Sequence, residues 1–273
     1  MAKEKTIEPA EMGFLDHLEV LRWHLIRAVL SIIVFGVAAF IFRDFIFDTV
    51  ILAPKSPTFF TNQVLCKFGT YIDVPALCIN SKPFQIINIK MAGQFSTHIM
   101  VSLVAGLIAA FPYVFWELWR FIKPALYTNE RKHARGAVFY SSSLFLTGIL
   151  FGYYILVPLS LDFLGGYNVS SQVLNQINLD SYIATFTSVV LASGVVFELP
   201  IVIFFLSKAG LITPEFLKTY RKHAIVVILV IAAIITPPDI FSQVLVSLPL
   251  LMLYEVGIII SRRVAKKKEK QTE

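Results

Sequence analysis

Six long apolar stretches alternate with polar segments along the chain, and each is a candidate membrane-spanning helix. They cover residues 25–42, 99–119, 137–156, 182–206, 224–235 and 244–260. A helix needs about 20 apolar residues to cross the ~30 Å hydrocarbon core of a bilayer, and the first four stretches come close to or exceed that length. The pattern predicts an all-α integral membrane protein with six transmembrane helices, in which residues 1–273 form a single polytopic domain.

Basic residues fall into every second gap between the stretches, and this sets the expected orientation. Of the 24 Lys and Arg residues, all but five lie near the amino terminus, in the second or fourth gap, or in the basic carboxy-terminal tail at 261–273. The five exceptions occupy the long loop at 43–93 and are Arg43, Lys55, Lys67, Lys82 and Lys90. Because cytoplasmic loops are enriched in Lys and Arg, we expect both termini in the cytoplasm and this loop outside.

The last two stretches are short, and several stretches contain or adjoin proline. Residues 224–235 would form a helix of about 18 Å at ~1.5 Å per residue, well below the thickness of the membrane core. Pro112, Pro158, Pro200 and Pro249 lie in or beside four of the stretches. Proline bends a helix, so we expect bent, partly short helices and a curved bundle.

The segment before the first stretch is amphipathic. Phe14, Leu18, Leu21 and Leu25 recur at helical spacing, with charged residues off that stripe. Such a segment either forms a separate helix along the cytoplasmic surface of the bilayer or extends the first span toward its amino terminus.

Composition excludes several classes of protein. With 56% hydrophobic residues, 15% charged residues and a mean hydropathy of +0.72, the chain is too apolar for an ordinary soluble domain. The basic residues flank the spans, which indicates contact with the lipid bilayer and no nucleic-acid partner. The phosphate-loop motif GxxxxGK[ST], the zinc motif HExxH and the pair CxxC are missing from the sequence. We therefore expect no cofactor, no metal, no catalytic residues and no enzymatic activity.

Cys66 and Cys78 both fall in the predicted outside loop. An oxidising compartment would allow a disulfide between them, closing a loop of about a dozen residues. Two free structural thiols are the alternative.

Glu198 is the most conspicuous charged residue, because it lies well inside the fourth stretch. A charge at that depth is costly, so the carboxyl group should face protein or water, or be protonated. One interpretation is a functional role. The other is a polar clasp to a neighbouring helix, with the candidate partners Ser141, Ser142, Ser143 and Thr147.

The segment that follows the second stretch, Phe121 to Arg131, combines an aromatic residue, a proline-bounded turn and a carboxylate at the cytoplasmic surface. Its carboxylate, Glu130, could hold a guanidinium group through two hydrogen bonds. Alone this signal is weak, because charged loops are usually solvated.

Four blocks taken together resemble the TatC family, the polytopic subunit of the twin-arginine protein translocase. They are HLEVLRWHL at 17–25, FIKPALYTNER at 121–131, SGVVFELP at 193–200 and TPPDIFSQ at 236–243. They appear in the order and on the membrane side that the family requires. The resemblance covers nearly the whole chain, except for residues 57–84 of the outside loop, which we interpret as an insertion.

The resemblance implies a function. TatC proteins recognise twin-arginine signal peptides of folded cargo in the bacterial cytoplasmic membrane. They assemble with the single-span proteins TatB and TatA into an oligomeric complex driven by the proton-motive force. Glu130 and Phe121 match family residues that engage the signal peptide, and Glu19 and Arg22 match its amino-terminal motif. The family usually has a second acidic residue after Glu19, where this chain has Val20; either Glu19 substitutes for it or Glu130 carries more of the recognition.

The resemblance also implies a second group of residues that take part in translocation or partner contact. Its members are Glu198, Pro54, Asp239 and Gln243. The main competing hypothesis is a secondary transporter that uses an intramembrane carboxylate, which would predict an inverted repeat that the sequence does not display. A purely structural membrane scaffold is the other; it would leave Glu130 dispensable.

Overall fold

The computed structural model describes residues 14–81, 84–122, 134–170, 172–173, 175–236 and 240–272. Its first half contains α1 (Phe14–Ile41), the short helices η1 (Phe45–Ile51) and η2 (Ala53–Lys55), α2 (Phe60–Tyr71), η3 (Pro75–Leu77), β1 (Ile86–Ile87) and α3 (Gly93–Ile122). Its second half contains α4 (Ala134–Phe151), η6 (Gly152–Leu156), α5 (Val157–Gly166), β2 (Ile177–Asn178), α6 (Leu179–Phe197), α7 (Leu199–Ala209), α8 (Pro214–Thr219), α9 (Arg221–Ile235) and α10 (Ile240–Thr272).

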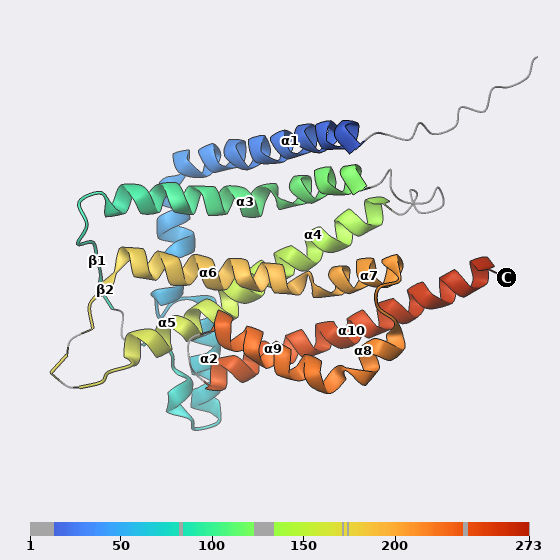
Figure 1. Ribbon diagram of the computed structural model, residues 1–273. Helices are drawn as coiled ribbons and strands as arrows, with labels where there is room; N and C mark the ends of the chain where they lie inside the picture. The colour runs from blue at the N-terminus through green and yellow to red at the C-terminus, as the bar shows by residue number, and fades with distance from the viewer. Residues whose placement is uncertain are drawn as a thin grey trace, which may run out of the picture.

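The long helices lie roughly along one common direction and form a bundle (Figure 1). Five of the described segments are long and apolar enough to cross a membrane: 18–41, 93–121, 136–166, 179–209 and 243–266. The predicted class, an all-α integral membrane protein, is confirmed. The fifth predicted span corresponds to α9, which has 15 residues and is too short to cross a typical bilayer unaided.

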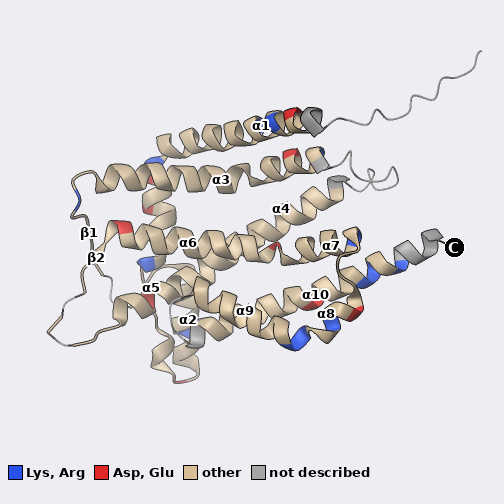
Figure 2. Cartoon of the chain, in the orientation of Figure 1, with Lys and Arg blue, Asp and Glu red and all other residues tan. Residues whose placement is uncertain are grey.

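The two ends of the bundle differ in charge (Figure 2). The helix shafts are almost free of charged residues, whereas Lys and Arg gather at the end where α7, α8 and the last turns of α10 lie. The start of α1 and the end of α10 lie at this same end (Figure 1). At the opposite end, the short strands β1 and β2 pair in parallel, with Ile86 beside Ile177, and so join two loops.

The amphipathic segment at the start of α1 continues directly into the first span. One helix runs without a break from Phe14 to Ile41. The structure therefore agrees with an extension of the first span rather than a separate surface helix. Helix α1 contains no proline, and no glycine before Gly36, so it lacks the residues that usually kink a helix there.

Glycines allow two helix pairs to approach closely. A Cβ atom added to Gly106 on α3 would lie 2.6 Å from the backbone nitrogen of Gly36 on α1. A Cβ atom on Gly148 of α4 would lie 2.6 Å from the carbonyl oxygen of Ser193 on α6. Small residues at such crossings let helix backbones pack within the membrane, where there is no hydrophobic driving force between helices.

Two of the four prolines lie where a spanning segment changes its helical form. In the third span α4 ends at Phe151 and is followed by the π-helix η6. Helix α5 then begins at Val157, next to Pro158. In the fourth span α6 ends at Phe197 and α7 begins at Leu199, next to Pro200. Pro112 and Pro249 instead lie inside continuous helices, α3 and α10.

The sixth span is longer than its apolar stretch suggested. Helix α10 extends to Thr272 and so includes most of the segment that we predicted as a basic tail. Lys, Glu and Gln are good helix formers, and an established helix is easily extended through them. A hydrogen bond of 2.8 Å between Ser207 and buried Ser261 joins this extension to α7.

Candidate functional site

A buried carboxylate joins α1 and α3 near the Lys- and Arg-rich end of the bundle. The side chain of Glu117 is 2% exposed. Its Oε2 atom lies 2.5 Å from Nδ1 of His24, and its Oε1 atom accepts a hydrogen bond of 3.1 Å from Arg120. Arg27 approaches Oε2 at 3.9 Å, and Tyr113 lies one helical turn before Glu117 on the same face of α3. We call these five residues the seam cluster.

Helical spacing explains how the seam cluster forms. His24 and Arg27 are three residues apart on α1, and Tyr113, Glu117 and Arg120 follow at spacings of four and three on α3. Side chains at these spacings share one face of a helix. A buried carboxylate with several charge-assisted hydrogen bonds is better stabilised than an isolated one, so these partners offset part of the cost of burying Glu117.

Our sequence reasoning missed the seam cluster. The signal was an acidic residue inside the second apolar stretch together with His24 at the start of the first. Each residue alone is ambiguous, because the sequence does not show that the two stretches pack against each other.

Phe121, a predicted site residue, lies next to the seam cluster. Its ring is 6.2 Å from the imidazole of His24, in an edge-on arrangement. Glu130, the predicted guanidinium-binding carboxylate, belongs to residues 123–133, which lie outside the described part of the chain. The structure therefore places Phe121 at the end of the α1–α3 seam and gives no position for Glu130.

The predicted amino-terminal residues Glu19 and Arg22 are exposed on α1. Successive residues of an α-helix differ in direction by about 100°, so Glu19 and Val20 face different ways. Val20 precedes His24 by four residues and shares its face toward the seam cluster. Glu19 thus lies off the face on which a carboxylate at position 20 would stand.

Glu198 lies at the junction of α6 and α7. Its Oε2 atom accepts a hydrogen bond of 2.8 Å from Ser141 on α4, one of the four partners proposed for a polar clasp. Its Oε1 atom is buried and has no hydrogen-bond partner among the described residues. The indole nitrogen of Trp119, also buried, is likewise unpartnered in the described part of the chain.

Glu198 and Trp119 line the same cavity of about 330 Å³ between α3, α4, α6 and α7. The other lining residues are apolar: Phe111, Phe115, Leu118, Phe145, Val195, Ile201, Val202 and Phe205. The cavity surface is therefore apolar, and Oε1 of Glu198 and the indole nitrogen of Trp119 are buried behind it.

The remaining predicted residues are separated from these sites. Pro54 is buried, and its carbonyl oxygen accepts a hydrogen bond of 3.0 Å from Asn62. Gln243 on α10 donates to the carbonyl oxygen of Leu229 on α9 at 3.1 Å and so ties these helices together. Asp239 lies outside the described residues.

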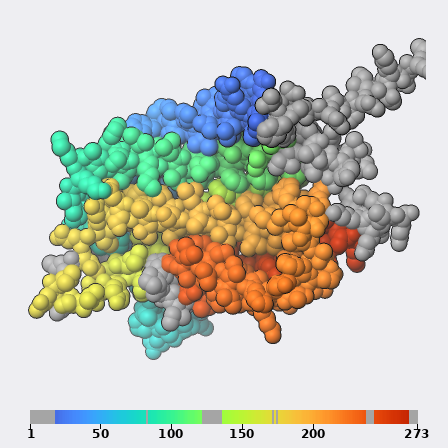
Figure 3. All heavy atoms as spheres, in the orientation of Figure 1, coloured from blue at the N-terminus to red at the C-terminus, as the bar shows by residue number. Residues whose placement is uncertain are grey.

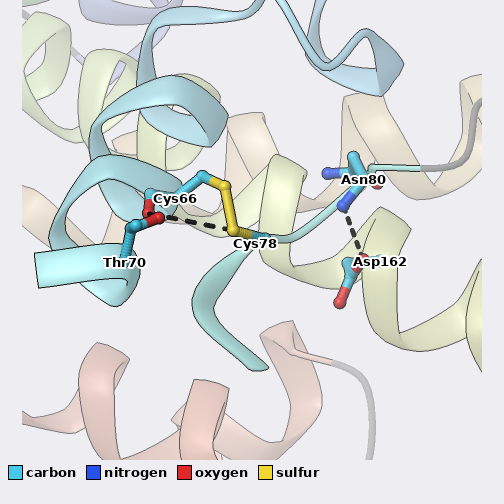
Figure 4. The surroundings of a disulfide bond; sticks show 5 residues. All are labelled: Cys66, Thr70, Cys78, Asn80 and Asp162. Carbon is cyan, nitrogen blue, oxygen red and sulfur yellow. Dashed lines mark hydrogen bonds between the residues drawn. A yellow bond between two sulfur atoms is a disulfide. The ribbon is translucent and has the colours of Figure 1, made fainter. Parts of the chain in front are cut away.

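Cys66 and Cys78 form a disulfide that joins α2 to the segment after η3 (Figure 4). Beyond Cys78, the backbone nitrogen of Asn80 donates to Asp162 on α5 at 2.7 Å. The side chain of Asn80 also donates to the carbonyl oxygen of Pro158 at 2.9 Å. The loop that we predicted as an insertion is therefore fixed to α5. Across the described residues, no group of three or more His, Cys, Asp and Glu side chains could hold a metal ion.

Fold and sites together define a polytopic α-helical membrane protein with a charged seam at one end, an apolar cavity within the bundle and a buried carboxyl group beside that cavity. Comparison with known proteins specifies the family. The model of the family "Sec-independent protein translocase protein (TatC)" matches residues 16–249. The chain therefore belongs to the TatC family.

Similar proteins agree with this assignment. A Sec-independent protein translocase protein TatC from Blattabacterium sp. subsp. Periplaneta americana is 39% identical over 96% of this chain and 99% of its own length. One from Aquifex aeolicus is 35% identical over 94% of this chain and 98% of its own length. A crystal structure of "Twin Arginine Translocase Receptor- TatC" is 34% identical, with a TM-score of 0.66, over 91% of this chain and 99% of that one.

Proposed function

We propose that this chain is the receptor subunit of a twin-arginine translocase and binds the signal peptides of folded cargo proteins. The observation that carries the proposal is the family match over residues 16–249, together with a solved relative whose name describes it as a receptor. The binding site that we propose comprises Glu130, Phe121, Glu19 and Arg22, at the Lys- and Arg-rich end of the bundle.

The proposed orientation places this end in the cytoplasm. Lys and Arg gather there, and the start of α1 and the end of α10 lie there too. Both features support cytoplasmic termini, because basic residues are retained on the cytoplasmic side. The short helix α9 completes a sixth crossing in this proposal, by local thinning of the bilayer.

In this proposal the seam cluster fixes the position of Phe121 in the binding site. Phe121 contacts His24, which Glu117 holds through a 2.5 Å contact. The main chain that leaves Phe121 leads directly into the segment containing Glu130. We propose that Glu117 positions the start of that segment relative to α1, and that Glu130 then binds the arginine pair through bidentate hydrogen bonds. Glu117 itself is too deeply buried to meet the peptide.

Glu198 has a different proposed role. It lines the cavity between α3, α4, α6 and α7, which meets a different face of α3 from the one that carries the seam cluster. We propose that it serves translocation or contact with TatA- and TatB-like single-span partners, as do Pro54, Asp239 and Gln243. The chain acts within an oligomeric complex in the bacterial cytoplasmic membrane, has no enzymatic activity of its own and depends on the proton-motive force.

Binding of a synthetic twin-arginine peptide to membranes carrying Glu130→Gln tests the proposal. The amide keeps hydrogen-bonding capacity but loses the charge, so we expect affinity to fall by about tenfold or more. Glu215→Gln, at the surface of α8, is the matched control and should bind as the unmodified chain does. Equal affinity for both variants would contradict the proposed role of Glu130.

A further inference from the structure

Helix α2 carries a stripe of large apolar side chains that the rest of the described chain does not cover. Phe60, Val64, Phe68 and Tyr71 recur at spacings of four, four and three, and all are exposed, Phe60 to 69% and Tyr71 to 88%. They share one face of the helix. This helix belongs to residues 57–84, which contain none of the family motifs and which we predicted as an insertion.

A second face of α2 packs on the protein. The side chain of Asn62, 1% exposed, donates hydrogen bonds to the carbonyl oxygens of Pro54 and Ser56, at 3.0 and 2.8 Å. Gly69 lies so close to η3 that a Cβ atom there would be 2.8 Å from Cβ of Leu77. The disulfide from Cys66 fixes the same region. The helix therefore cannot rotate to bury its apolar stripe without breaking these contacts.

A third face is polar. Gln63, Lys67 and Thr70 are exposed and follow each other at spacings of four and three beside the apolar stripe. A helix with an apolar face next to a polar, basic face is typical of segments that lie in the interface of a membrane.

The depth of α2 agrees with such a position. Thr61 donates a hydrogen bond of 2.5 Å to the carbonyl oxygen of Tyr154, and Phe60 packs edge-on to the Tyr154 ring. Tyr154 comes 18 residues after Gly136, the first residue of the third candidate span. At ~1.5 Å per residue that is about 27 Å, close to the ~30 Å thickness of the hydrocarbon core. With Gly136 placed at one membrane boundary, the start of α2 lies near the other boundary.

We propose that α2 is an interfacial helix that inserts Phe60, Val64, Phe68 and Tyr71 into the lipid leaflet at this end of the bundle. In the proposed orientation this is the outer leaflet. Figure 3 shows the atoms of the α2 segment projecting beyond the side of the bundle, where lipid surrounds a membrane protein. The apolar stripe thus continues the lipid-facing surface of the spans, and the insertion serves as an anchor in the bilayer. The proposal does not depend on signal-peptide binding.

Photo-cross-linking of the full-length chain in native membranes tests it. We would replace Phe68 by p-benzoylphenylalanine, which preserves an exposed aromatic side chain, and use the same replacement at Gln63 as the matched control on the polar face. After irradiation, mass spectrometry of the purified chain would quantify phospholipid adducts. We expect the adduct yield at Phe68 to exceed that at Gln63 by about fivefold or more, because only the apolar face contacts acyl chains.

Three results would overturn the proposal: equal lipid adducts at both positions, no lipid adduct at either, or predominant cross-linking of Phe68 to another protein. The last result would identify the stripe as a protein interface instead. Labelling of free thiols in denaturant would verify that the Cys66–Cys78 disulfide is intact in each variant, so that a difference in yield cannot arise from an unfolded insertion.

Discussion

The Nδ1 atom of His24 on α1 lies 2.5 Å from the Oε2 atom of Glu117 on α3. This is the shortest of three polar contacts between the two helices that the described residues show; Arg27 also approaches Glu117, and the imidazole of His98 lies 3.1 Å from the carbonyl oxygen of Phe40. The side chain of Glu117 is 2% exposed and that of His24 is 14% exposed. A buried carboxylate needs its partners, because an unpaired charge in such an environment is strongly destabilising.

We predict that Glu117→Ala destabilises the protein by about 1–3 kcal/mol, since hydrogen bonds from His24 and Arg120 lose their acceptor. Thermal unfolding in a mild detergent would measure the effect. Glu255→Ala is the matched control, because Glu255 pairs with Arg221 at 2.8 Å while both side chains are about half exposed. Such exposed pairs contribute ~1 kcal/mol or less. A Glu255 variant that is as unstable as the Glu117 variant would contradict this view of the seam cluster.

A second prediction concerns the close approach of α1 and α3. Gly106→Ala should destabilise the chain by about 1–3 kcal/mol, because the new methyl group would meet the backbone of Gly36 and Ile32 within 2.8 Å. Gly36→Ala should be tolerated, since its nearest neighbour across the helix pair, the Ser102 carbonyl oxygen, is 3.4 Å away. Resistance of the two variants to limited proteolysis in membranes would distinguish them. Equal resistance would show that the helix pair readily separates to accept the methyl group.

The fold was largely predictable from the sequence, because apolar stretches of membrane-spanning length are a strong signal. All five candidate spans overlap predicted stretches. The helical extension of α10 through the basic tail was not predictable, because Lys-rich sequence is compatible with either helix or solvated chain. The seam cluster was also missed, because Glu117 and His24 are 93 residues apart and only the packing of α1 on α3 brings them together.

The candidate site was predictable in part. Phe121 was found from its motif, and the structure adds its neighbour His24. For Glu198, the sequence identified an intramembrane carboxylate and four possible hydroxyl partners, but only the crossing of α4 and α6 selects Ser141. The sequence could not show that the second carboxyl oxygen is buried without a hydrogen-bond partner among the described residues.

Glu198→Ala should impair export of a folded reporter protein by about tenfold or more, because it removes a carboxyl group buried within the membrane bundle. Binding of a twin-arginine peptide should be unchanged, because Glu198 meets a different face of α3 from the one that carries the seam cluster. Ser141→Ala is the informative companion. It removes the hydrogen bond to Oε2 but keeps the carboxyl group, so export should fall much less. Normal export with Glu198→Ala would refute a role in translocation.

The disulfide gives a further prediction. Replacing both Cys66 and Cys78 by Ser should make the insertion more accessible to protease added from the outer side, because the bond closes a 12-residue separation and restricts the unfolded segment. Peptide binding at the opposite end should be unaffected. If cleavage of the insertion is no faster in the double variant, the contacts of Asn62 and Asn80 suffice to hold it.

Capture of arginine-bearing signal peptides beside the α1–α3 seam is most directly tested by photo-cross-linking from position 121. A photoreactive residue would replace Phe121 in the full-length chain in membranes, which would then be offered a twin-arginine peptide or its twin-lysine version. We predict strong cross-linking to the arginine peptide and at least about tenfold less to the lysine peptide, because lysine cannot form the planar bidentate contact. Equal cross-linking of the two peptides, or none with either, would contradict the account.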